Sequence, residues 1–135
     1  MYVLREWHVD GEVLRPPKVE GRFLVANGQV LTFLNNRSNA ANQTTVVAVG
    51  SYVLDATHFS YSYSETSTFV QTPSAISASR KPPWEGVRTF ALAAEDNTVR
   101  LSAENGKYEM LFTTEGLTYS EDGKVLRVWR RAEKP

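Results

Sequence analysis

The sequence of 135 residues contains no cysteine and only two histidines. The absence of cysteine excludes disulfide bonds, thiolate nucleophiles and cysteine-containing metal sites. His8 and His58 do not stand in a spacing typical of metal ligands, so we predict no metal site. Glycine-rich phosphate loops and the Gly-x-Ser-x-Gly elbow of serine hydrolases are also missing. We therefore predict no cofactor and no nucleotide-dependent chemistry.

Neither sign of charge is in excess, since 15 Lys and Arg residues balance 15 Asp and Glu residues. A neutral chain has no overall field that would draw it to nucleic acid, so we expect no nucleic-acid partner. No window approaches the roughly 20 apolar residues of a membrane span, and the first residues lack the apolar segment of a signal peptide. A cytoplasmic location and the absence of a membrane span are the resulting expectations.

Helical periodicity is also nearly missing, and short runs rich in Val, Thr, Tyr and Phe take its place. Turn-forming pairs separate several of these runs and predict tight antiparallel hairpins: Asp10-Gly11, Asn27-Gly28, Asn105-Gly106 and Asp122-Gly123. The main strands are expected at Tyr2–Val9, Val19–Ala26, Gln29–Leu34, Thr44–Leu54, His58–Ser64, Val87–Ala94, Thr98–Ala103, Tyr108–Thr113 and Lys124–Arg131. Short extra strands are expected at Thr68–Gln71, Ala75–Ser79 and Leu117–Ser120.

The length and the strand count together predict one all-β domain over residues 1–135. Eight to ten strands in up-and-down order can remove their open edges by closing into an antiparallel barrel, which leaves room for side chains or one small ligand. Two stretches interrupt the strand pattern. The polar segment Asn35–Gln43 is expected to be a mobile loop, and Glu65–Gly86, which includes Trp84, to form a lid over one mouth of the barrel.

Short motifs follow one another along nearly the whole chain. They are Tyr2-x-Leu4, Trp7-x-x-Asp10-Gly11, Pro16-Pro17, Gly21-Arg22-Phe23, Gly50-x-Tyr52 before Asp55, Pro83-Trp84-x-Gly86-x-Arg88-x-Phe90-x-Leu92, and Leu126-x-x-Trp129-x-Arg131. Their order resembles the bacterial and fungal lipocalin-like domain family. The resemblance implies a calycin-type barrel and transfers no catalytic residue. One departure is that Tyr2 stands where the family usually has Gly-x-Trp, so packing of a first-strand indole against a late arginine is not carried over.

Strand alternation predicts which side chains face the interior. Arg88 shares a face with Phe90 and Leu92, and a charge on an apolar face must be paired or reach water. We predict Arg88 as a polar anchor of an internal pocket; the alternatives are an internal salt bridge or a place at the barrel rim. A β-bulge would reverse the faces of the residues beyond it.

Two aromatic sets are predicted to line the same pocket. One set contains Tyr108, Met110 and Phe112, and the other contains Phe59, Tyr61 and Tyr63. Aromatic walls with phenolic hydroxyls suit a flat apolar ligand that is oriented by hydrogen bonds. The alternative is ordinary core packing. The predicted ligand-binding residues are Arg88, Tyr108, Phe90, Met110, Phe112, Tyr61, Tyr63 and Trp84.

The sequence indicates only weak candidates for catalysis: His58 as a general base, with Tyr61 and Glu109 as further acid or base groups. His58 also fits an ordinary surface histidine after the turn at Asp55. The leading hypothesis is a binding module for a hydrophobic or aromatic small molecule. The alternatives are a cofactor-independent cyclase or isomerase, and a filled barrel that acts through its surface, for example as a homodimer. The basic run Arg127, Arg130, Arg131 and Lys134 predicts either a small anion patch or a solvated edge strand.

Overall fold

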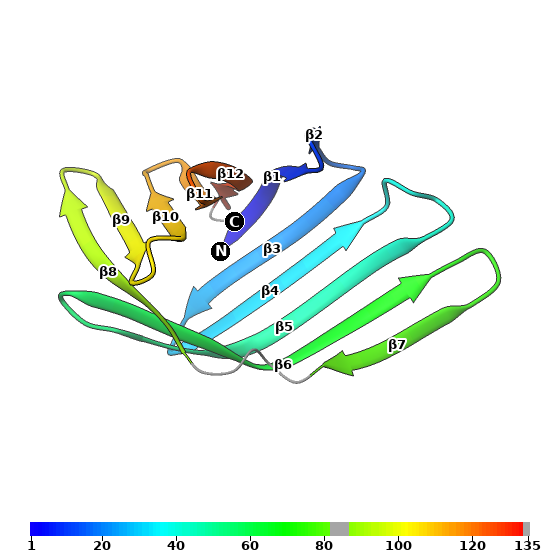
Figure 1. The fold of residues 1–135 in the computed structure, drawn as a ribbon, viewed down its shortest axis with the longest axis horizontal. Helices are drawn as coiled ribbons and strands as arrows, with labels where there is room; N and C mark the ends of the chain where they lie inside the picture. The colour runs from blue at the N-terminus through cyan, green and yellow to red at the C-terminus, as the bar shows by residue number, and fades with distance from the viewer. Residues whose placement is uncertain (82–86, 134–135) are drawn as a thin grey trace.

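The computed structural model describes residues 1–81 and 87–133, and this part of the chain contains twelve β-strands and no helix (Figure 1). The strands are β1 (Tyr2–Val9), β2 (Glu12–Leu14), β3 (Val19–Ala26), β4 (Gln29–Asn36), β5 (Gln43–Leu54), β6 (His58–Gln71), β7 (Ile76–Lys81), β8 (Arg88–Glu95), β9 (Thr98–Ala103), β10 (Tyr108–Phe112), β11 (Gly116–Glu121) and β12 (Lys124–Arg131). No helix of the described residues is long and apolar enough to cross a membrane.

Ten of these strands form a closed antiparallel barrel, as the sequence predicts. Neighbours along the sheet run β12-β11-β10-β9-β8-β6-β5-β4-β3-β1, and pairing of β1 with β12 closes the circle. The first and the last strand of the chain therefore lie side by side (Figure 1). β2 pairs only with β1 and β7 only with β6, so these two strands extend the sheet outside the ring.

The predicted bounds of β1, β3, β9 and β12 agree with the structure. The predicted lid over 65–86 is wrong for its described part, because β6 continues to Gln71 and turns back into β7 as a hairpin that prolongs the sheet (Figure 1). The interpretation of Asn35–Gln43 as a loop holds only between Asn36 and Gln43, where β4 ends and β5 begins. Trp84 lies outside the described residues.

Tight turns connect several neighbouring strands. Both residues have positive φ angles at Asp10–Gly11, Asn27–Gly28 and Asp122–Gly123, as type I′ turns require. The pair Asn105–Gly106 differs, because only Gly106 has a positive φ and four residues separate β9 from β10. Two-residue turns of this kind therefore form at three of the four pairs, in agreement with the three or four tight hairpins that the sequence predicts.

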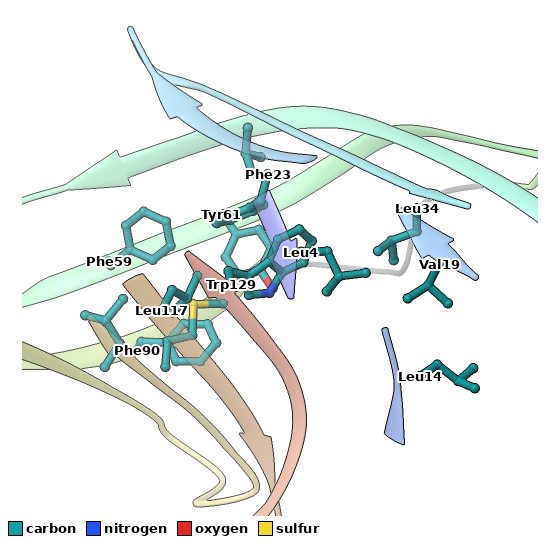
Figure 2. Close-up of a cluster of buried hydrophobic side chains, with 13 residues drawn as sticks. Leu4, Leu14, Val19, Phe23, Leu34, Phe59, Tyr61, Phe90, Leu117 and Trp129 are labelled. Atoms are coloured by element: carbon teal, nitrogen blue, oxygen red, sulfur yellow. The ribbon is translucent and has the colours of Figure 1, made fainter. Parts of the chain in front are cut away.

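The apolar core fills part of the barrel interior (Figure 2). Phe90 is fully buried at 0% exposure, and its ring stacks against Tyr61 with centroids 5.9 Å apart. Phe59 and Trp129, each 5% exposed, extend the cluster toward β5 and β3. The predicted inward faces of β6, β8 and β10 agree with this burial, since no bulge interrupts their alternation between the residues concerned.

Three β-bulges lie beside this core and change which side chains point inward; the one on β1 skips Arg5 in the pairing with β12. On β6 the pairing with β5 skips Ser64, so Tyr63 and Thr66 both face the interior. Gly50 lies opposite Tyr63 at this bulge, where a Cβ would be 1.8 Å from the Ser62 carbonyl oxygen. On β12 the pairing with β11 skips Leu126.

Candidate functional site

A cavity of about 400 Å³ lies inside the barrel. Its wall is mixed, with apolar side chains, four tyrosines and two arginines. The lining residues of the described chain are Phe23, Thr32, Leu34, Val46, Ala48, Tyr61, Tyr63, Thr66, Arg88, Tyr108, Met110, Leu117, Tyr119, Glu121, Leu126, Arg127 and Trp129. The volume lies within the range of small-molecule pockets, about 300 to 1,000 Å³.

Arg88 is held by tyrosines. It lies at the start of β8, directly opposite Tyr61 of β6. Its Nη1 donates a hydrogen bond of 3.4 Å to the hydroxyl of Tyr119, and its Cζ lies 4.6 Å from the ring centroid of Tyr108. Burial lowers the pKa of Arg88, but the phenols of Tyr61, Tyr119 and Tyr108 raise it by more. The guanidinium is therefore a charged donor group fixed in the cavity wall.

Arg127 is the second cation of the cavity and lies on β12 between Tyr119 of β11 and Trp7 of β1. Its Cζ lies 5.4 Å from the Trp7 ring and 5.8 Å from the Tyr119 ring. Its Nε is fully buried and has no hydrogen-bond partner among the described residues. Burial lowers the pKa of Arg127, although an arginine remains charged at neutral pH. Trp7 of β1 therefore lies against Arg127 of β12, so an indole of the first strand does contact an arginine near the C-terminus.

Burial keeps the hydroxyls of Tyr61, Tyr63 and Tyr119 protonated at neutral pH. Burial raises the pKa of Tyr61 well above its usual value, and it also raises the pKa values of Tyr63 and Tyr119. The Tyr63 and Thr32 hydroxyls form a hydrogen bond of 2.5 Å. The rings of Tyr108 and Tyr119 stack at 5.9 Å with 9° between their planes. The polar part of the wall is therefore rich in hydrogen-bond donors.

Acidic side chains contribute little to this wall. Glu121 is the one acid among the described lining residues, and its Oε1 lies 3.0 Å from Lys107 Nζ. This pair is partly exposed, so Glu121 is already neutralised at the periphery. The two arginines therefore make the cavity electropositive.

Five of the eight predicted ligand-binding residues line the cavity: Arg88, Tyr108, Met110, Tyr61 and Tyr63. Phe90 does not, because it is packed in the filled core between Phe59 and Tyr61. Phe112 faces inward but packs edge-on against Tyr2 at 5.8 Å. The structure thus places these two phenylalanines in the core, as the alternative of ordinary packing expects.

Two of the three catalytic candidates lie away from the cavity. His58 is exposed, with Nδ1 2.8 Å from the hydroxyl of Thr57 in the turn that Asp55 caps. Glu109 points outward from β10 and pairs with Arg100 on β9. Tyr61 alone faces the cavity. The acid and base groups named from sequence are therefore not assembled into one site.

Several cavity residues were not among the sequence predictions, above all Arg127 and Tyr119. The basic run at the C-terminus does not form one patch, because Arg127 points inward while Arg130 and Arg131 are exposed. Nor is β12 an edge strand, since it pairs with both β11 and β1. The alternation of side chains along β12 places Arg127 on the same face as Trp129. This signal could have identified Arg127 as an interior residue.

Comparisons with protein-family models, curated proteins and solved structures found no match.

Proposed function

We propose that this barrel binds a hydrophobic or aromatic small molecule in its internal cavity, with Arg88 and the adjacent tyrosines orienting one polar end. The observation that carries the proposal is the cavity of about 400 Å³ in a barrel whose remaining interior is closely packed. Met110, Leu117 and Trp129 contribute apolar and aromatic surface to its wall. Arg88 and Tyr119 contribute hydrogen-bond donors to the same wall. This combination is typical of small-molecule sites. The resemblance to the lipocalin-like domain family supports the same proposal.

Binding accounts for this arrangement better than catalysis does. A cyclase or isomerase needs an acid or base in contact with its substrate. His58 and Glu109 lie outside the cavity. Tyr61 remains, but its raised pKa keeps it protonated at neutral pH, so it can serve only as an acid and neither of the other two candidates supplies a base beside it. Binding requires only the shape and the donors that are present.

The test is fluorescence titration with N-phenylnaphthylamine, an uncharged dye that brightens in apolar surroundings. We expect saturable binding of one dye per protein. The variant Ala48→Phe should weaken it at least tenfold, because Ala48 is 5% exposed, lines the cavity and would project a ring into it. Native mass spectrometry of the purified protein would show in parallel whether a small molecule is already bound.

The matched control is Val49→Phe, which adds a ring at the next position of β5. Val49 is 37% exposed and is not a cavity-lining residue, so this variant should bind the dye like the wild type. Unfolding curves for both variants separate lost binding from lost folding. Absence of saturable binding, or equal loss in the two variants, would refute the proposed function.

A further inference from the structure

The two arginines of the cavity differ in how their charge is accommodated. Arg88 donates to a phenolic oxygen, Tyr119 Oη. Arg127 makes no ion pair within the described residues, and its closest partners are the faces of Trp7 and Tyr119. Its buried Nε has no acceptor among the residues that the structure describes. A buried donor without an acceptor is costly, so the place of this half-buried arginine in a cavity wall calls for an explanation.

Both arginines flank the same tyrosine. Arg88 reaches the hydroxyl of Tyr119, while Arg127 lies 5.8 Å from its ring centroid. Tyr61 and Tyr63 lie within electrostatic reach of Arg88 and Arg127 alike. Two positive charges and several protonated phenols therefore converge on one side of the cavity. Glu121, the one acid of the described lining, is engaged by Lys107.

We propose that the ligand carries an oxyanion, of which a carboxylate is the common biological form, and that this group binds at Arg127 with Arg88 as the second cation. The proposal rests on the proposed function and specifies the class of ligand. A guanidinium presents its donors in a planar fork that matches the oxygens of a carboxylate. Such a ligand would bring a counter-charge and acceptor oxygens to the guanidinium of Arg127, which lines the cavity and has no ion pair within the described residues. Its aromatic or apolar body would lie against Met110, Leu117 and Trp129.

The test compares two ligands that differ only in charge: naphthoate and its uncharged amide, naphthamide. Each displaces N-phenylnaphthylamine from the protein, and the ratio of the two dissociation constants is the readout. In the wild type we expect naphthoate to bind at least tenfold more tightly than naphthamide, as is typical of a charge-assisted hydrogen bond. Arg127→Met should bring the ratio close to one.

The matched control is Arg130→Met, which removes an exposed, outward-pointing arginine three positions along the same strand. It should leave the ratio unchanged. If Arg127 only supports the fold through its contact with Trp7, Arg127→Met would weaken the binding of both ligands equally. The ratio of their dissociation constants would then stay at its wild-type value, which would overturn the proposal. The more conservative Arg127→Lys and the independent Arg88→Met, each expected to lower the ratio, provide the test if Arg127→Met does not fold.

The outcomes separate the two proposals. If N-phenylnaphthylamine does not bind to the wild type, the proposed function fails and this inference fails with it. If the dye binds but naphthoate and naphthamide displace it equally well, the cavity binds small molecules and only the anion preference is refuted. A preference for naphthoate that persists in every arginine variant would equally overturn the assignment to Arg127.

Discussion

Two parts of the barrel interior are built by the same strands and yet differ in character. β6 contributes Phe59 to the filled part and Tyr63 to the cavity, and β8 contributes Phe90 to the first and Arg88 to the second. A step of two residues along β8, or of four along β6, thus changes the interior from close packing to a polar wall. The filled part contains side chains of almost no exposure, such as Phe90 at 0% and Leu4 at 1%.

The difference teaches how a small barrel divides its interior between stability and binding. Close packing of Phe59, Phe90 and Leu4 stabilises the fold through apolar burial. The cavity holds Arg88 and Arg127 at the cost of their hydration and leaves a space unfilled. Stability should therefore depend on the first region and ligand affinity on the second. The predictions below test that division, from the largest expected effect to the smallest.

The largest effect is expected in the filled part. Phe90→Ala removes a ring with 0% exposure from the centre of the core and leaves a cavity behind. We expect a loss of about 3 to 5 kcal/mol in the free energy of unfolding, measured by urea denaturation. A loss below about 1 kcal/mol would mean that this region is not the packed part of the barrel.

Alkaline pH should destabilise the fold through the buried phenols. Burial raises the pKa of Tyr61 above its ordinary value of 10.0, so the folded state holds a proton that the unfolded state loses as pH rises past that value. The contribution is fully present below about pH 10 and declines above it, by up to about 1.4 kcal/mol per pH unit. Urea unfolding from about pH 9 to about pH 11 measures the slope. Tyr61→Phe should have a shallower slope than the wild type, and an equal slope would contradict this assignment.

A smaller effect is expected from one polar contact in the cavity wall. Tyr63→Phe removes the partner of the Thr32 hydroxyl, which is itself 9% exposed. We expect a loss of about 1 to 2 kcal/mol in the free energy of unfolding. Thr32→Val in the same background should add little further loss, because the hydrogen bond is already absent. Fully additive losses would show that the two hydroxyls do not depend on each other.

The smallest effect on stability is expected at the cation of the cavity. Arg127→Met replaces a poorly partnered charge by an apolar side chain, so we expect the free energy of unfolding to change by less than about 1 kcal/mol, or to rise. The same urea unfolding measurement as for Phe90→Ala makes the comparison direct. A loss of unfolding free energy as large as that of Phe90→Ala would show that Arg127 is needed for stability. It would contradict the division of the interior into a stabilising part and a binding part.

The fold could be predicted from sequence because its signals are local. Strand runs bounded by Asp10–Gly11, Asn27–Gly28 and Asp122–Gly123 determine hairpins through φ angles that few other residues adopt. The β6–β7 hairpin was predicted only in part, as the short strands Thr68–Gln71 and Ala75–Ser79, because its residues are polar and serine-rich on both faces. The strand propensity of this segment did not show how far its strands extend. β6 continues to Gln71 because it pairs with β5 over almost its whole length.

The candidate site could be predicted only in part. Alternation correctly placed Arg88, Tyr61 and Tyr108 on inward faces, because period two holds wherever no bulge intervenes. Alternation could not show that Phe90 belongs to the packed core and not to the cavity wall, because core residues and cavity-lining residues lie on the same face of a strand. Arg127 was missed because its strand was interpreted as an edge, and only the pairing of β12 with β1 reveals that it is enclosed. The strand count predicts that a barrel closes, but local patterns do not show which two strands pair to close it.

The most direct test of the central claim is a crystal structure of the protein grown with N-phenylnaphthylamine. Our account predicts the dye inside the barrel, against Met110, Leu117 and Trp129, with the packing around Phe90 unchanged. Dye bound only to the outer face of the sheet, where Leu24 and Phe69 are exposed, would contradict it. So would a barrel whose interior side chains have closed over the cavity.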